Sequence, residues 1–125
     1  MKTMLATCLF ALLAFTSAAC ASNADEVALT TANGPLRLHI VHHASFVLHW
    51  NHKTIYVDPT GAGDLYRDQG APDLILITHA HGDHLSPKTL AAIDTSHATV
   101  VMPRSVSDEI GTRFGKAQVV MENGA

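Results

Sequence analysis

The stretch that decides the fold is residues 74–85, LILITHAHGDHL. A short apolar run is followed at once by three histidines and one aspartate, which are His79, His81, Asp83 and His84. The apolar run predicts a buried strand, and the polar residues predict a loop at its end. Imidazole nitrogens and carboxylate oxygens are ligands for zinc and related divalent metals. The stretch therefore predicts a metal site at the end of a strand.

The spacing of these residues indicates how they could converge. His79 and His81 are two positions apart, so an extended backbone would point both side chains to the same side. Gly82 permits a tight bend with positive φ, and such a bend could turn Asp83 and His84 toward a second ion. This arrangement suits a two-metal centre with ions about 3.5–4 Å apart. The alternative is a histidine-rich polar loop that binds no metal.

The pattern His79-x-His81-x-Asp83-His84 resembles the HxHxDH signature of the metallo-β-lactamase-fold hydrolases. Residues 43–46 (HASF) and 54–59 (TIYVDP) resemble the early strands of one branch of that superfamily. This branch includes the ascorbate-phosphate lactonases and the N-acyl-phosphatidylethanolamine phospholipase D enzymes. The resemblance runs from about Leu36 to about Met121. One departure is His42, where the branch usually carries glycine.

The resemblance implies an α/β fold, the N-terminal half of a metallo-β-lactamase-type αββα sandwich. Residues 36–125 are then a domain that is incomplete at its C-terminus. Family members continue with a second sheet, a further histidine for the first metal, a bridging aspartate and a last histidine. One sheet here would expose an apolar face. We therefore expect either a piece of a longer protein, or a dimer or partner chain that completes the sheet.

The motif match also implies a role for each residue. His79 and His81 would ligate the first metal, and Asp83 and His84 the second. Asp83 would be the catalytic residue, because in the family it often orients or deprotonates the attacking water. Zinc is the default for a histidine-rich site, while iron or manganese fits the same ligands, as one ion or two.

Two residues outside the motif are candidates with alternatives. By the family match Asp58 accepts a hydrogen bond from a ligating histidine and fixes its tautomer; otherwise it is a turn-forming aspartate before Pro59. His43 is expected to line the site or to be an ordinary packed or surface histidine. The other histidines match no ligand spacing and are predicted to be strand-face or turn residues: His39, His49, His52 and His97.

The reaction that the resemblance implies is hydrolysis, in which metal-activated water attacks an ester, lactone, phosphodiester, thioester or β-lactam bond. The substrate would be a small molecule or lipid-like. The second hypothesis is a non-catalytic or degenerate metal-binding protein, complete as written. The formal net charge is −3, and no basic or aromatic-rich surface predicts nucleic-acid binding.

The N-terminus reads as a secretory signal peptide over residues 1–21. Lys2 precedes an apolar segment from Met4 to Phe15, and small residues then permit cleavage after Ala21. This predicts a secreted or periplasmic protein. The alternative is a membrane-anchored lipoprotein with lipidated Cys20. Residues 22–35 are small and polar, which predicts a flexible lead-in.

Hydropathy patterning predicts a β-meander followed by a βαβαβ arrangement. A helix is expected from Ser86-Pro87 through Ile93, and a second from Ser105 or Ser107 to near Gly115. Phe46 and Trp50 are predicted to belong to the core. The expected strands cover residues 36–41, 46–50, 54–58, 74–78, 98–102 and 118–121.

Overall fold

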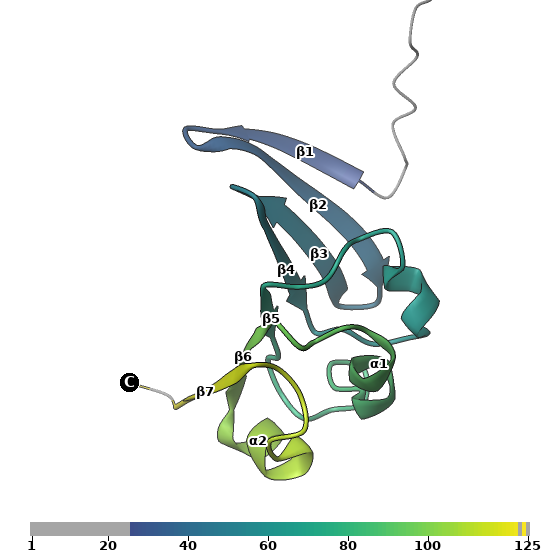
Figure 1. The fold of residues 1–125 in the computed structure, drawn as a ribbon, viewed down its shortest axis with the longest axis vertical. Helices are drawn as coiled ribbons and strands as arrows, with labels where there is room; N and C mark the ends of the chain where they lie inside the picture. Colours follow the sequence, from purple (N-terminus) through teal and green to yellow (C-terminus); the bar gives the residue numbers. More distant parts are fainter. Residues whose placement is uncertain (1–25, 123, 125) are drawn as a thin grey trace, which may run out of the picture.

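The computed structural model describes residues 26–122 and 124, which form one mixed sheet with its strands in chain order (Figure 1). The first four strands are antiparallel and the last four are parallel, with β4 common to both parts. The predicted meander followed by βαβαβ is confirmed. The strands are β1 (Glu26–Thr31), β2 (Gly34–His42), β3 (Ser45–Trp50), β4 (Lys53–Val57), β5 (Leu74–Leu76), β6 (Thr99–Pro103) and β7 (Ala117–Met121).

Three short helical segments connect the parallel strands: η1 (Gly63–Tyr66), α1 (Pro87–Ala92) and α2 (Arg104–Ile110). Helix α1 begins as predicted, because the Ser86 side chain accepts a hydrogen bond from the Thr89 N–H. Helix α2 starts slightly earlier than predicted and ends well before Gly115. The reason is Gly111, which caps the helix with φ +57° and stops it after Ile110.

The core lies on one face of the sheet. Val47, Tyr56, Ile75 and Val100 occupy matching register positions on β3 to β6, so their side chains point to the same side. All four are buried, and they share one cluster with helix residues Leu90, Val106 and Ile110. The helices therefore cover this face.

The opposite face is apolar and only partly covered. A second row of register partners crosses the sheet there: Ile40, Phe46, Val57, Leu76, Val101 and Val119. Ile40 is 47% exposed and Val119 is 42% exposed. The core prediction for Phe46 and Trp50 is therefore wrong, because both are only partly buried. Phe46 points to the open face, and Trp50 Nε1 donates a hydrogen bond to Thr31 Oγ1 (3.1 Å).

The flexible lead-in predicted for residues 22–35 is wrong for its second part, which forms a strand. Residues 26–31 form strand β1, which pairs along its whole length with β2. The signal was weak because the segment has only two large apolar residues, Val27 and Leu29, with the small Ala28 between them, although Asn33-Gly34 is a typical hairpin pair. The signal peptide, Cys20 and the start of the lead-in lie outside the described residues.

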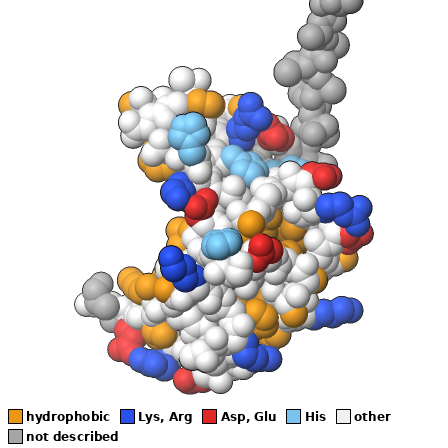
Figure 2. All heavy atoms as spheres, viewed as in Figure 1, with side chains coloured by type: hydrophobic (Ala, Val, Ile, Leu, Met, Phe, Trp, Pro, Cys, Tyr) orange, Lys and Arg blue, Asp and Glu red, His pale blue; other side chains and the backbone are white. Residues whose placement is uncertain are grey.

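A polar groove of about 830 Å³ lies where β2 and β4 begin and β3 ends. Figure 2 shows histidine, basic and acidic side chains on the upper part of this face, over the first strands of the sheet. The groove lining includes His39, His49, His52, Lys53 and Gln69. We call it the far groove, because β2 and β4 run from it toward the edge that carries residues 78–85.

Candidate metal centre

The loop of residues 78–85 follows β5 at the edge of the sheet where β2 and β4 also end (Figure 1). Ile77 is buried, and its N–H donates to the Val101 carbonyl (2.9 Å), which fixes the start of the loop. Leu85 is buried at the other end. Two apolar anchors therefore hold a polar loop at the carboxyl end of a central strand, as the sequence predicts.

Three of the four predicted ligands converge. His79, Asp83 and His84 each offer one ligand atom, and these atoms all lie within 4.8 Å of one another. The ring centroids of His79 and His84 are 3.9 Å apart, and His84 Nε2 is 3.5 Å from Asp83 Oδ2. Two imidazole nitrogens and a carboxylate oxygen are a donor set for zinc, iron or manganese. The residues present therefore fit a divalent metal.

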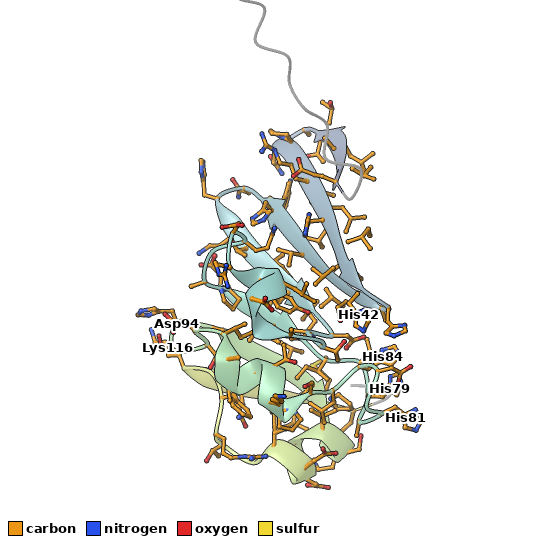
Figure 3. The ribbon with its side chains drawn as sticks, turned by 90° about the vertical axis from the view of Figure 1, so that its right-hand side faces the viewer. His42, His79, His81, His84, Asp94 and Lys116 are labelled. Atoms are coloured by element: carbon orange, nitrogen blue, oxygen red, sulfur yellow. The ribbon has the colours of Figure 1, made fainter. Side chains whose placement is uncertain are left out.

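His81 lies beside this group but outside it. Its side chain is exposed, and its ring centroid is 4.7 Å from that of His79 (Figure 3). The His84 and Leu85 N–H groups both donate to the His81 carbonyl, so the chain turns at this residue and returns Asp83 and His84 toward His79. Gly82 does not adopt a positive φ, so the prediction that the bend depends on a positive φ at this residue is wrong.

Asp58 holds the loop and one ligand together. It is 2% exposed; its Oδ1 accepts from the Thr78 N–H (2.7 Å), and its Oδ2 accepts from Thr78 Oγ1 (2.7 Å). Oδ2 also lies 2.8 Å from His84 Nδ1. A hydrogen on Nδ1 that is donated to Asp58 leaves Nε2 as the ligand nitrogen. Asp58 thus lies where its predicted role requires it, and its φ of +45° is a strained conformation for aspartate.

The tip of the β2–β3 hairpin lies at the same edge. His43, the predicted lining residue, is exposed with φ +49°, and its ring lies against that of His42, with centroids 4.1 Å apart. Figure 3 shows His42 at the same end of the molecule as His79, His81 and His84. The hairpin therefore borders the candidate centre.

Sequence reasoning missed two supporting residues. Thr78 donates twice to Asp58, and the fully buried Ser45 side chain donates to the Asp58 carbonyl (2.5 Å). These partners are 20 and 13 positions from Asp58. No local spacing pattern predicts such distant pairs. The only signal was weak: Thr78 directly precedes the histidine motif, and Ser45 lies within the stretch of residues 43–46.

The segment between β4 and β5 is supported by two buried tyrosines. Tyr66 Oη donates to the Thr60 carbonyl (2.9 Å), and Tyr56 Oη donates to the Gly70 carbonyl (2.6 Å). Burial raises the pKa of Tyr56 to about 12 and also raises the pKa of Tyr66. Both hydroxyls therefore remain protonated donors at neutral pH, and they fix the segment that follows Asp58.

Residues 37–123 match the sequence model of the beta-lactamase superfamily domain. This chain belongs to that family. Among its relatives is a UPF0173 metal-dependent hydrolase of Geobacillus sp. (strain WCH70), 34% identical over 55% of this chain and 32% of the relative. Another, from Lysinibacillus sphaericus (strain C3-41), is 32% identical over 66% of this chain and 38% of the relative.

Solved structures show the same family fold. A protein of Parabacteroides distasonis ATCC 8503, provisionally assigned as a metal-dependent hydrolase, is 30% identical with a TM-score of 0.66, over 80% of this chain and 44% of that one. The metallo hydrolase Igni18 of Ignicoccus hospitalis KIN4/I is 21% identical with a TM-score of 0.56, over 72% and 41%. The chain therefore has the α/β fold of part of a beta-lactamase superfamily domain, and spans less than half the length of each of these proteins.

Proposed function

We propose that this chain carries the metal-binding part of a hydrolase that cleaves an ester, lactone or phosphodiester-type bond. The observation that supports it most is the convergence of His79, Asp83 and His84 within 4.8 Å at a strand end. The names of the relatives, metal-dependent hydrolases, support the same reaction class. Zinc is the metal we propose first, because nitrogen donors dominate the set.

His79, Asp83 and His84 would hold the metal, and His81 would join them by a rotation of its exposed side chain. When bound, the metal supplies Lewis acidity and lowers the pKa of water. Asp83, with a side chain that is 62% exposed, orients the attacking water and takes up its proton. The water oxygen bonds to the acyl or phosphoryl centre, the ester bond breaks, and the leaving oxygen takes up the proton that Asp83 received from the water. Asp58 keeps His84 in the tautomer that presents Nε2.

The open apolar face supports a second layer as part of the same proposal. Ile40 and Val119 are large apolar side chains that remain more than 40% exposed at register positions across this face. Extended apolar patches of this kind mark interaction surfaces. We propose that further polypeptide, from a longer chain, a partner or a second copy, packs on this face and supplies the remaining metal ligands.

Export is a further part of the proposal, supported by the sequence of residues 1–21 alone. Among the described residues, no helix is long and apolar enough to cross a membrane. Cell fractionation and mass spectrometry of the mature N-terminus test the proposal. Ser22 as first residue supports cleavage after Ala21, whereas lipidated Cys20 supports the anchored alternative.

Zinc titration of the full chain by calorimetry tests the central part, followed by a screen of chromogenic esters, lactones and phosphodiesters. We expect saturable zinc binding that His79→Ala abolishes and His97→Ala leaves intact, because His97 is an exposed histidine outside the ligand group. Asp83→Asn should remove zinc-dependent turnover in the presence of the completing polypeptide. Zinc binding without turnover of any substrate, with the completing polypeptide present, would favour the non-catalytic metal-binding alternative.

A further inference from the structure

The tip of the β2–β3 hairpin carries two adjacent histidines that the proposed mechanism does not use. We propose that the imidazoles of His42 and His43 bind an anionic oxygen group of the substrate, a phosphate or carboxylate, beside the metal centre. The inference rests on the proposed function, because it assigns these rings to the substrate of the same site. It predicts a preference for substrates that carry negative charge near the bond to be cleaved.

The hairpin tip is fixed in place by Ser45. The Ser45 side chain donates to the Asp58 carbonyl, lies 2.7 Å from Thr60 Oγ1, and accepts from the Thr60 N–H (3.1 Å). The ring of His42 lies over the next residue, since a Cβ on Gly61 would be 3.4 Å from His42 Cδ2. The tip is therefore packed on the segment 58–61 rather than free in solvent.

The same segment holds the metal loop. Asp58 is hydrogen-bonded through its side chain to His84 and through its carbonyl to Ser45. One residue therefore fixes the candidate ligand and the hairpin tip relative to each other. Figure 1 places the β2–β3 turn next to this edge, and Figure 3 shows His42 beside His84 and His79.

The two rings are available to a ligand. Both are exposed, their centroids are 4.1 Å apart and their planes are 64° from parallel. Within residues 26–122, no hydrogen bond involves the ring of His42 or of His43. They also lie outside the group of ligand atoms formed by His79, Asp83 and His84, which argues for contact with substrate rather than with metal.

Two imidazoles side by side offer N–H donors that suit an oxygen anion. Two carboxylates of the metal loop and its support are already engaged: Asp58 accepts from Thr78 and lies 2.8 Å from His84, and Asp83 belongs to the ligand group. A divalent ion in that group would add positive charge at the same edge. An anionic substituent held there would orient the neighbouring ester bond toward the centre.

The test follows the histidine ring signals of the full chain by NMR while methyl phosphate or acetate is added, with and without zinc. We expect the His42 and His43 signals to shift with at least one anion, and the larger response identifies phosphate or carboxylate as the preferred group. Trimethyl phosphate, which has no charge, should cause no shift. An absence of shifts with both anions would overturn the proposal.

Matched variants locate the effect. His43→Asn preserves the left-handed backbone that asparagine tolerates, and His52→Asn is its control because His52 has φ +60° in the exposed turn at the far groove. We expect His42→Ala and His43→Asn each to weaken anion binding about 10-fold, and His52→Asn to change it less than two-fold. Zinc affinity should stay within two-fold in all three. A parallel loss of zinc affinity would make these rings metal ligands and contradict the proposal.

The two proposals can fail separately. If zinc does not bind but the anion still shifts His42 and His43, the hydrolase proposal fails, and the two rings remain an anion site without the assignment to a hydrolase substrate. If zinc binds and the anion shifts neither ring, the anion site fails and the hydrolase proposal stands.

Discussion

Histidines gather at both ends of the sheet, but among residues 26–122 only one end forms a candidate metal site. At the loop end, His79 and His84 converge with Asp83 around a buried carboxylate. At the far groove, His49 uses both ring nitrogens in hydrogen bonds, Nδ1 with Thr54 Oγ1 (3.3 Å) and Nε2 with Gln69 Oε1 (3.1 Å). Histidine density is therefore a poor guide to a metal site.

The difference lies in what surrounds the rings. Asp58 is buried and directs His84 Nε2 toward its neighbours. The far groove is lined by two exposed acids, Glu26 and Asp68, and the neighbouring Asp73 is occupied by the groove residue Lys53, whose Nζ lies 2.7 Å from it. The hydrogen bond from Lys53 holds the pKa of Asp73 below its usual value. In the described part of the chain, the far groove brings no three ligand-type side chains together. A buried carboxylate that orients one ring and a chain turn that returns its neighbours therefore distinguish the candidate site from the far groove.

The largest expected effect is the loss of metal at one end only. His84→Ala removes a ligand and leaves Asp58 without its histidine partner, so we expect zinc affinity to fall more than about 100-fold. His49→Ala should leave zinc affinity unchanged within two-fold. Competition titration with a chromophoric chelator measures both. Equal losses in the two variants would remove the distinction between the two ends.

The next effect concerns the buried carboxylate. Asp58→Asn replaces one oxygen acceptor with an amide donor, which disturbs the bonds from Thr78 and His84. We expect zinc affinity to fall about 10- to 100-fold, less than for loss of a direct ligand. The same chelator titration checks this order. Unchanged affinity would show that Asp58 does not position His84.

A smaller effect is expected on stability when the far groove is changed. His49→Ala removes hydrogen bonds with Thr54 and Gln69, and we expect a loss of about 1–2 kcal/mol in the free energy of unfolding. Urea denaturation measures this, with exposed His97→Ala as the control. A stability equal to that of the wild type would mean that the two bonds contribute nothing.

The smallest effect concerns the segment that joins the two ends. Tyr56→Phe removes the hydroxyl that donates to the Gly70 carbonyl, which should lower stability by about 1 kcal/mol at pH 7. Burial raises the pKa of Tyr56 from 10.0 to about 12, so its stabilising effect is complete below pH 10 and is lost as the pH rises through about 12.

Urea titrations between pH 9 and 12 check the sign. The difference between wild type and Tyr56→Phe should shrink across that window. A difference that is constant with pH would contradict a raised pKa.

Much of this arrangement could be predicted from the sequence, because local signals carried it. The apolar run before His79, the Ser86-Pro87 helix start and the Asp58-Pro59 strand end each act over a few residues. The grouping of ligands was harder. His81 stands outside the cluster because the chain already turns at its carbonyl, so the two-apart rule for strands no longer applies.

Contacts between residues far apart in the sequence could not be predicted. The hydrogen bonds from Ser45 and Thr78 to Asp58 depend on the register of β3, β4 and β5, which no short pattern encodes. Strand β1 was missed because an edge strand needs few apolar residues and gains its order by pairing with β2.

The candidate metal centre is tested most directly by a long-range ¹H–¹⁵N NMR spectrum of the histidine rings, recorded with and without one equivalent of zinc. We predict that the ligand nitrogens of His79 and His84 shift on metal binding, with His84 bound through Nε2, while the signals of His39, His49 and His52 stay in place. Zinc-dependent shifts at the far groove, or unmoved His79 and His84 signals, would contradict the account.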